Sequence, residues 1–524
     1  MNPGAADAPV ALVVGSGFGG LAGAIRLAAR GYRVTVLERQ DTPGGRAAVF
    51  RQDGFTFDAG PTIITAPFLL EELWTLCGRR MADDVDLRPV DPFYRLRFDD
   101  GSWFDYSGDP ARMRAEVVRL SPQDVAGFER FVAEADTCYR LGFEQQGPAP
   151  FQTFDGLLAQ IPAMLKMKAW RTLHGMAARH LRDPRLRIVM SFHPLLIGGN
   201  PFAVSSIYSL ITALERRFGV HWAMGGTGTL VRGLVGLLEG LGGQLRLNAE
   251  VREITVAAPG SAGNKSGRRP RATGVRLASG DTLSADVVVC NADTAWTYRH
   301  LIDARHRRHW TNRRIERARH SMSLFVWYFG TDRVYPGVPH HVMLFGPRYR
   351  ELMNDIFKRQ VLASDFSLYL HRPTATDPSM APPGNDAFYV LVPVPHLGSG
   401  TDWATQAEPY RRAIADALDR TVLPGFQSHV VTSRVMTPQD FRDRLLSYQG
   451  AAFGLEPVLQ QSAWFRPHTC SEDIDGLYIV GASTHPGAGI PGVLNSARAL
   501  DALVPAVGAR AGGVAPNPHP WQRE

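Results

Sequence analysis

Three glycines near the start of the chain have the spacing of a phosphate-binding turn. Gly15, Gly17 and Gly20 follow the apolar run Val10–Val14, and a helical pattern at 21–30 follows them. Gly15 permits a tight turn, Gly17 lets the backbone approach a pyrophosphate, and Gly20 lets helix and strand pack closely. Free N–H groups at a helix N-terminus favour an anion there. The turn therefore predicts a dinucleotide-binding site.

An acidic residue completes this fingerprint. The apolar stretch 32–37 is predicted to be a second strand, and it ends at Glu38. A carboxylate in this place accepts hydrogen bonds from a ribose in dinucleotide-binding folds. The alternative is an ordinary glycine-rich turn between a strand and a helix.

The residues after Glu38 separate FAD from NAD, which share the fingerprint. Gly44, Gly45 and Arg46 follow directly, and Gly-Phe-Thr-Phe-Asp-Ala-Gly-Pro occupies 54–61. Here the sequence resembles the flavoproteins that include amine oxidases, protoporphyrinogen oxidase and carotenoid desaturases. In that group a Gly-Gly-Arg loop packs against the FAD diphosphate and ribityl chain, where an arginine supplies fixed positive charge. A surface salt bridge is the alternative role for Arg46, and the pattern favours FAD.

Composition indicates a globular, mildly basic protein. Its 524 residues exceed one ordinary core, 44% of them are apolar, and the formal net charge is +7. No lysine and arginine tract with interleaved aromatics, zinc-finger spacing or helix-turn-helix pattern suggests a nucleic-acid partner. A basic protein can instead bind an anionic membrane surface.

Cysteine spacing and hydropathy indicate the cellular compartment of the protein. The four cysteines lie far apart and form no C-x-x-C, so we expect neither disulfides nor a metal site. The N-terminus lacks the basic and apolar regions of a signal peptide, and no apolar run has the length of a membrane span. We expect a protein on the cytoplasmic side that is peripheral to the membrane.

Strand and helix patterns alternate in the manner of an α/β protein. Helical patterns dominate 111–222, strand patterns return between 244 and 290, and a strand at 476–480 precedes the glycine-rich loop 481–492. We predict a Rossmann-like FAD-binding domain of the amine-oxidase and carotenoid-desaturase type, a discontinuous substrate domain and a helical membrane-associating lobe. The predicted domains are FAD-binding segments at 9–110, 223–300 and 471–510, a helical substrate and membrane lobe at 111–222, and a substrate-binding domain at 301–470.

Further motifs extend the resemblance over nearly the whole chain. They lie at 192–202, 223–227, 323–330, 345–351, 365–370 and 461–467, and the most specific is Gly-Ala-Ser-Thr-His-Pro-Gly-Ala-Gly-Ile-Pro-Gly at 481–492. With 15–46 and 54–61, they make the chain similar to the bacterial-type phytoene desaturases, FAD-dependent enzymes of carotenoid biosynthesis. The wider oxidase group usually has an acid after the first glycine of the last loop, whereas Ala482 and Ser483 stand here, as in carotenoid desaturases generally.

The resemblance implies FAD as the cofactor. In the family the C-terminal loop and helix contact the flavin, and a strand position matching Val251 holds the adenine through its backbone. The residues predicted to bind FAD are Gly15, Ser16, Gly17, Phe18, Gly19, Gly20, Glu38, Arg39, Gly44, Gly45, Arg46, Pro61, Thr62, Val251, Gly481, Pro491, Gly492 and Val493.

The resemblance also implies a reaction, the desaturation of phytoene to neurosporene or lycopene. Hydride transfer to flavin N5 and loss of a proton from the adjacent carbon form each double bond. The conjugated chain stabilises the allylic cation, so no strong base is required, and no Ser-His-Asp or paired-carboxylate pattern occurs. We predict no catalytic acid or base: Asp155 is a general base or a helix cap, and His193 and His485 are structural or contact the flavin. No second nucleotide-binding pattern occurs, so oxygen or a membrane quinone is the expected electron acceptor.

Other functions stay open at this stage. A desaturase of hydroxy- or methoxyneurosporene would share these motifs, and a carotenoid isomerase would use reduced FAD without net redox change. An amine oxidase would need an aromatic cage facing the flavin. A lipid-binding protein resembling the escort proteins of prenylated GTPases would not need the intact glycine fingerprint.

A basic amphipathic stretch is the predicted membrane contact. A helix from Ile161 to Met176 would place Leu165 and Trp170 among apolar residues, with Lys166 and other basic residues between them. A core helix with a solvated basic face is the alternative. Because phytoene is a hydrocarbon that must be drawn from a bilayer, the interfacial reading is favoured.

Overall fold

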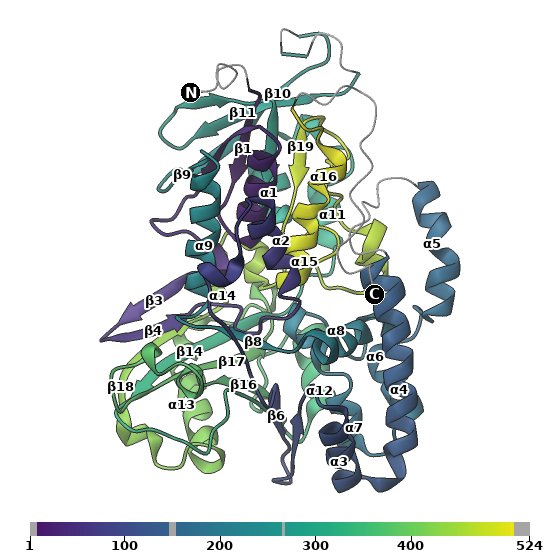
Figure 1. The fold of residues 1–524 in the computed structure, drawn as a ribbon, viewed down its shortest axis with the longest axis vertical. Helices are drawn as coiled ribbons and strands as arrows, with labels where there is room; N and C mark the ends of the chain where they lie inside the picture. The colour runs from purple at the N-terminus through teal and green to yellow at the C-terminus, as the bar shows by residue number, and fades with distance from the viewer. Residues whose placement is uncertain (1–7, 146–153, 262, 265–267, 508–524) are drawn as a thin grey trace.

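A computed structural model describes residues 8–145, 154–261, 263–264 and 268–507. A five-stranded sheet lies in the upper part of the molecule and a seven-stranded sheet in the lower part, with a helical lobe at the lower right (Figure 1). Segments from the beginning, middle and end of the chain build the upper sheet, so this part of the fold is discontinuous in sequence.

The five-stranded sheet is parallel and has the order β19-β13-β1-β2-β9. Its central strands are buried on both faces, which explains their continuously apolar sequences. Helix α1 packs against α9 and α15 on one face. This layering confirms the predicted α/β class. The strands are β1 (Val10–Val14), β2 (Arg33–Leu37), β9 (Gln244–Arg246), β13 (Val287–Cys290) and β19 (Leu477–Ile479), and the nearby helices are α1 (Phe18–Ala29), α2 (Phe68–Leu76), α9 (Thr227–Gly240), α15 (Ile490–Arg498) and α16 (Leu500–Leu503).

A small antiparallel sheet covers the other face of the parallel sheet. Leu12 and Val288 of the parallel strands share a hydrophobic core with Ile254 and Val275 of this layer. Strands β10 and β11 pair in antiparallel register, and residues 262 and 265–267 between them lie outside the described residues. The strands are β10 (Val251–Ala257), β11 (Arg271–Leu277) and β12 (Thr282–Ser284).

The seven-stranded sheet has the order β18-β14-β17-β16-β15-β6-β7. Helix α13 (Trp403–Thr421) covers one face, where Trp403 and Leu418 pack against Phe325. Val342 of β15 pairs in parallel register with Arg95 of β6. The strands are β6 (Tyr94–Arg97), β7 (Trp103–Tyr106), β14 (Ser323–Thr331), β15 (His341–Leu344), β16 (Leu368–His371), β17 (Asp386–Val394) and β18 (Val430–Met436).

Strands β6 and β7 therefore belong to the sheet of residues 323–436, although the boundary at 110 grouped them with the FAD-binding segments. Pairing between strands so far apart in sequence leaves no local pattern to detect. The remaining strands and short helices are β3 (Val49–Gln52), β4 (Phe55–Asp58), β5 (Leu87–Pro89), β8 (His221–Ala223), α10 (Thr294–Trp296), α11 (Asn312–Arg317), α12 (Tyr349–Asn354) and α14 (Pro438–Asp443).

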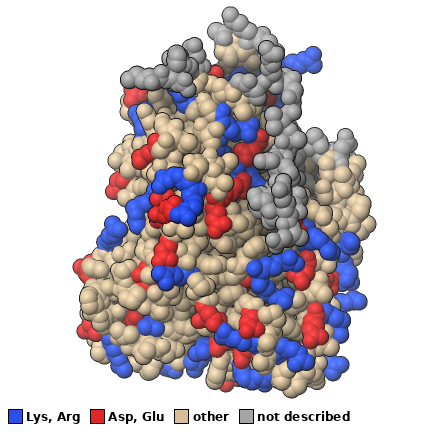
Figure 2. Space-filling model, viewed as in Figure 1, with Lys and Arg blue, Asp and Glu red and all other residues tan. Residues whose placement is uncertain are grey.

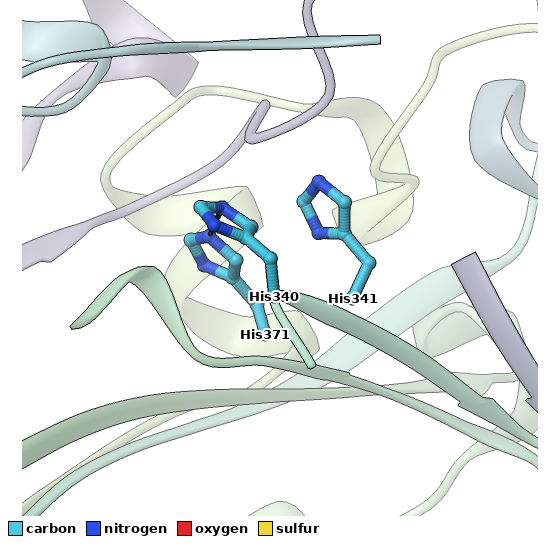
Figure 3. Close-up of side chains that lie close together, drawn as sticks. All are labelled: His340, His341 and His371. Atoms are coloured by element: carbon cyan, nitrogen blue, oxygen red, sulfur yellow. Dashed lines mark hydrogen bonds between the residues drawn. The ribbon is translucent and has the colours of Figure 1, made fainter. Parts of the chain in front are cut away.

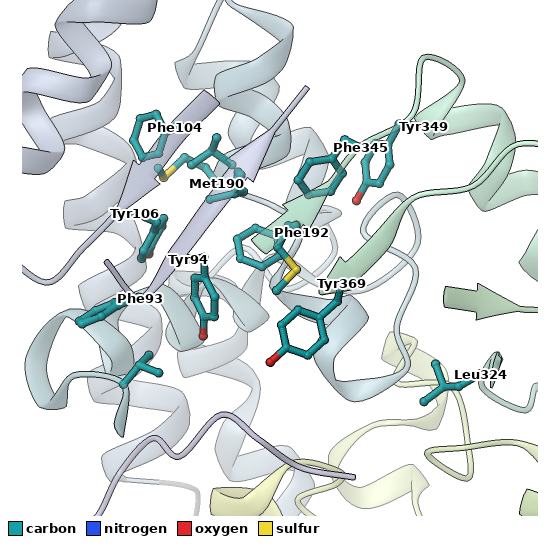
Figure 4. Close-up of a cluster of buried hydrophobic side chains, with 14 of the residues drawn as sticks. Phe93, Tyr94, Phe104, Tyr106, Met190, Phe192, Leu324, Phe345, Tyr349 and Tyr369 are labelled. Carbon is teal, nitrogen blue, oxygen red and sulfur yellow. The ribbon is translucent and has the colours of Figure 1, made fainter. Parts of the chain in front are cut away.

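An aromatic core joins the second face of the seven-stranded sheet to the helical lobe (Figure 4). Tyr94 from β6 contacts Phe192 edge to face with ring centroids 5.6 Å apart, and Phe192 in turn contacts Phe345. Such pairs add stability beyond the area they bury. The lobe consists of α3 (Pro110–Leu120), α4 (Val125–Cys138), α5 (Phe154–Lys166), α6 (Leu173–His180), α7 (Pro184–Val189) and α8 (Leu210–Phe218).

The predicted single helix from Ile161 to Met176 is wrong. Helix α5 ends at Lys166, Lys168 has a left-handed φ of 52°, and α6 begins after Thr172, whose hydroxyl accepts a hydrogen bond from the Gly175 N–H. The turn divides the apolar residues. Leu165 and Trp170 are 58% and 59% exposed, whereas Met167, Leu173 and Met176 are buried. The exposed apolar residues thus lie on α5 and the turn, and α6 is a core helix.

Candidate functional site

The two glycine loops predicted to bind the cofactor lie against each other. Gly17 and Gly44 form an isolated parallel bridge, and the Gly44 N–H donates to the Ser16 carbonyl oxygen at 3.2 Å. Gly45 has a left-handed φ of 57°, and a Cβ atom on Gly20 would collide with the Gly15 carbonyl oxygen. The absence of side chains at these positions is therefore required by the fold.

Asn291 lies at the centre of this cluster and was not identified from the sequence. A Cβ atom on Gly19 or on Gly481 would lie 2.6 Å from its Oδ1, and one on Gly17 would lie 2.9 Å from its Nδ2. Asn291 directly follows β13, the neighbour of β1. A polar residue at the carboxyl end of a central parallel strand is the signal that could have revealed it.

Glu38 is held at the end of β2, with 5% of its surface exposed. Its Oε2 accepts hydrogen bonds from the Ser16 N–H at 2.9 Å and the Ser16 hydroxyl at 2.7 Å, and its Oε1 accepts one from the Gln40 N–H. The Ala249 N–H donates to the Glu38 carbonyl oxygen, which places the start of β10 at Val251 beside it. Glu38 and Val251, the residues predicted to contact the ribose and the adenine, are thus neighbours.

Arg46 forms no ion pair with a described residue, so the surface salt bridge is not its role. Its Nη2 donates to the Ser447 hydroxyl at 3.0 Å, and its buried Nε has no hydrogen-bond partner. Burial lowers the pKa of Arg46, and the nearby charge of Asp293 opposes that shift. An unpaired buried donor in this place suits an anionic ligand.

The C-terminal loop at 481–492 lies beside the first glycine loop. The Gly481 N–H donates to the Ser496 hydroxyl at 2.8 Å, and a Cβ atom on Gly19 would lie 3.0 Å from Val493 Cγ1. Gly492 packs on the carbonyl of Gly487, and Pro491 lies in the first turn of α15. The N-terminal ends of α1 and α15 therefore converge, and Phe18 is buried in the first turn of α1.

Arg39 and Thr62, which were predicted to contact FAD, form hydrogen bonds with other parts of the protein. The Arg39 guanidinium donates to the carbonyl oxygens of Asp443 and Arg444. Thr62 is buried and its hydroxyl lies 2.7 Å from the Tyr369 hydroxyl, whereas Pro61 beside it is half-buried. Thr62 thereby joins the glycine-loop region to the seven-stranded sheet.

The acid of the 54–61 motif makes structural hydrogen bonds. Asp58 is fully buried and its carboxylate accepts hydrogen bonds from the Thr227 N–H at the start of α9. Burial raises the pKa of Asp58 to about 6, while these hydrogen bonds oppose the shift. The acid therefore ties β4 to α9.

Three buried histidines gather on the seven-stranded sheet (Figure 3). His341 and His371 are register partners on adjacent antiparallel strands, so their side chains share a face. The Nε2 atoms of His340 and His371 lie 3.0 Å apart, and Tyr369 bonds His341 Nδ1 at 2.7 Å. One nitrogen from each ring lies within 4.8 Å of the others. Burial lowers the pKa of His340 to about 3 and those of the other two well below 6.5, so all three are neutral.

The remaining candidates are Asp155, His193 and His485. Asp155 is the second residue of α5, so it does not precede that helix as an N-cap, and its side chain lies outside the described residues. His193 is fully buried, and its Nε2 lies 3.1 Å from Glu215, which also accepts from the Tyr94 hydroxyl. His485 is buried in the C-terminal loop.

The residues present fit FAD. Glycine loops open to backbone approach, two converging helix N-termini, a buried acid at the end of β2 and an unpaired arginine donor match a diphosphate joined to a ribose. The geometry thus defines a dinucleotide site of the kind that flavoproteins use.

Comparison with known proteins identifies the class. Residues 18–499 match the model of the flavin-containing amine oxidoreductases. An oxidoreductase from Methanosarcina mazei superposes with a TM-score of 0.62 at 17% identity, covering 94% of this chain and 99% of that one, and putrescine oxidase bound to putrescine superposes with a TM-score of 0.62 at 15% identity, covering 94% and 99%. These two likenesses concern the fold alone. The chain belongs to the flavin-containing amine oxidoreductase family, whose cofactor here is FAD.

Near-full-length relatives define a narrower branch within that family. The neurosporene-forming phytoene desaturase of Cereibacter sphaeroides is 47% identical over 506 residues, covering 96% of this chain and 95% of that protein. The lycopene-forming phytoene desaturase of Pseudescherichia vulneris is 49% identical over 494 residues, covering 94% and 98%. This likeness places the chain in the bacterial phytoene desaturase branch, as its motifs indicated. Within the described ranges, every helix is too short or too polar to cross a lipid bilayer.

Proposed function

We propose that this protein desaturates phytoene to more conjugated carotenes, neurosporene or lycopene. The observation that carries the proposal is near-full-length identity of 46–49% to phytoene desaturases that form these two products. The glycine cradle, Glu38 and Arg46 supply the FAD site that such a reaction needs. When bound, FAD supplies the hydride acceptor.

The protein's own residues contribute binding, orientation and exclusion of water. Aromatic and aliphatic side chains between the seven-stranded sheet and the helical lobe form a dry interior near Thr62 and Tyr369. A desaturase of hydroxy- or methoxyneurosporene and a carotenoid isomerase are the alternatives.

Membrane association is part of the proposal. Leu158, Ile161, Leu165 and Trp170 are exposed on α5 and the turn after it, beside exposed Lys166. Basic side chains are also frequent over the helical lobe at the lower right of Figure 2. Apolar residues entering the acyl boundary, with basic residues at the headgroups, would hold the protein on the cytoplasmic side of a bilayer. We further propose oxygen or a membrane quinone as electron acceptor.

Product analysis tests the proposal. FAD-loaded protein is incubated with phytoene in liposomes under air, and the carotenes are separated by HPLC. Formation of neurosporene or lycopene supports the proposed function. Turnover of only hydroxylated or methoxylated carotenoids, or isomerisation that requires reduced FAD, would identify one of the alternatives.

A further inference from the structure

A groove of about 610 Å³ lies between α11 and the segment 459–465. Buried Trp310, just before α11, and Phe465, which is 40% exposed, both line it. The Gln461 side chain accepts from the Arg319 N–H and donates to the Arg319 carbonyl oxygen, which holds the two walls together. These hydrogen bonds therefore fix the two segments that form the groove.

Three arginines line the groove without an acidic partner among the described residues: Arg313, Arg314 and Arg317. The Arg314 guanidinium lies over the Trp310 ring, 4.0 Å from its centroid, and this contact fixes its direction.

The acidic residues near the groove are already engaged. Glu316 pairs with Arg299 at 2.8 Å, and Glu472 accepts a hydrogen bond from Trp310 Nε1 at 3.0 Å. Asp473 binds His309 Nδ1 at 2.7 Å. Three positive charges therefore face the groove uncompensated, next to apolar surface. Guanidinium groups in this setting favour a phosphate ligand.

Hydrogen bonds link the segment 459–465 of the groove to the turn that carries Trp170. The hydroxyl of Ser462 lies 3.4 Å from that of Tyr208, and the Ser206 N–H donates to the Arg171 carbonyl oxygen beside exposed Trp170. Phe465 and Trp170 thus lie on segments that contact each other through one short helical turn.

We propose that this groove binds the phosphodiester headgroup of an anionic phospholipid in a bilayer. The arginines contact the phosphate, and Phe465 lies beside the first acyl carbons. The inference rests on the membrane association in the proposed function and adds to it a headgroup site that is separate from α5. Such a site selects anionic membranes and fixes the orientation of the protein on them.

The test compares two triple variants of the FAD-loaded protein. Arg313→Gln/Arg314→Gln/Arg317→Gln alters the groove, and Arg411→Gln/Arg412→Gln/Arg420→Gln removes the same charge from α13, at the far end of the molecule in Figure 1. Partitioning is measured with phosphatidylglycerol and with phosphatidylcholine vesicles. At about 1 kcal/mol for each arginine near the surface, the groove variant should lose roughly a hundredfold in partitioning to phosphatidylglycerol, and the α13 variant should lose far less.

Equal losses in both variants would show that net charge alone matters and would overturn the proposal. Parent-like partitioning of the groove variant, with product formation from phytoene intact, would overturn this inference and leave the proposed function standing. Full competition by soluble glycerol 3-phosphate would assign the groove to a soluble phosphate and would also overturn it. Parent-like FAD uptake by both variants verifies that they are folded.

Discussion

The Ser16 hydroxyl donates a 2.7 Å hydrogen bond to Glu38 Oε2, which joins the first glycine loop to the end of β2. The acid predicted to bind a ribose therefore also fixes the loop predicted to bind the phosphates. Because one carboxylate orients both parts of the site, its loss should weaken binding of both the ribose and the phosphates.

Glu38→Ala is expected to weaken FAD binding by roughly 1.5–3 kcal/mol, the usual cost of losing a hydrogen bond to a charged group. Flavin fluorescence during titration of the apoprotein measures this affinity. Ser16→Ala, which keeps the carboxylate and removes one of its donors, should cost less. Unchanged affinity in Glu38→Ala would show that Glu38 does not hold the cofactor.

Gly19→Ala is expected to prevent normal FAD uptake. Its Cβ would lie 2.6 Å from Asn291 Oδ1, 3.0 Å from Val493 Cγ1 and 3.1 Å from the Gly481 Cα, so the two loops would be forced apart. Gly236→Ala in α9 is the control, because a Cβ there meets nothing within 4 Å. That variant should gain about 0.5–1 kcal/mol in stability. Normal flavin content in Gly19→Ala would contradict the close approach of these loops.

Asp58 should make the stability of the apoprotein depend on pH. Its pKa in the folded protein, about 6, is raised above the unfolded value of 3.8, so its favourable contribution is complete below about 3.8 and is lost as pH rises through 6. At 1.36 kcal/mol per pKa unit, the loss is about 3 kcal/mol. Urea unfolding at pH 4, 5 and 7 should show the stability of the parent falling relative to Asp58→Asn over this range. A constant difference between the two proteins would exclude this role for Asp58.

The three-histidine cluster is expected to hold no metal ion. The Nε2 atoms of His340 and His371 lie 3.0 Å apart in a hydrogen bond, and Tyr369 binds His341 Nδ1 at 2.7 Å, so a metal ion would have to displace these hydrogen bonds. Elemental analysis of the purified protein should therefore find less than one equivalent of zinc or copper. One equivalent that disappears in His371→Ala, with His174→Ala as a control, would contradict this expectation.

Leu165→Ser/Trp170→Ser should lower turnover of liposomal phytoene and vesicle binding while leaving FAD uptake intact, because both side chains are exposed. Leu76→Ser/Trp103→Ser is a matched control, since these residues are 43% and 46% exposed elsewhere on the molecule. Parent-like binding and turnover in the first variant would show that α5 and its turn do not contact the membrane.

The sequence predicted the features that depend on local pattern. The strand, glycine turn, helix and strand from Val10 to Leu37 appear as predicted, because each step has its own short-range signal. The break at Lys168 was missed because amphipathic spacing continues through a turn that only backbone geometry reveals. His341 and His371 meet through strand register, and Asn291 through convergence of three loops. The arginines of 304–320 did not stand out as a patch until α11 placed three of them in one groove.

A protein with a FAD site of this geometry and these relatives is expected to desaturate phytoene. The most direct measurement is HPLC of carotenes from FAD-loaded protein and phytoene liposomes, with Gly19→Ala as the cofactor-deficient control. We predict neurosporene or lycopene from the parent protein and none from the variant. Unchanged phytoene after incubation with fully FAD-loaded parent protein and either oxygen or a quinone would contradict the claim.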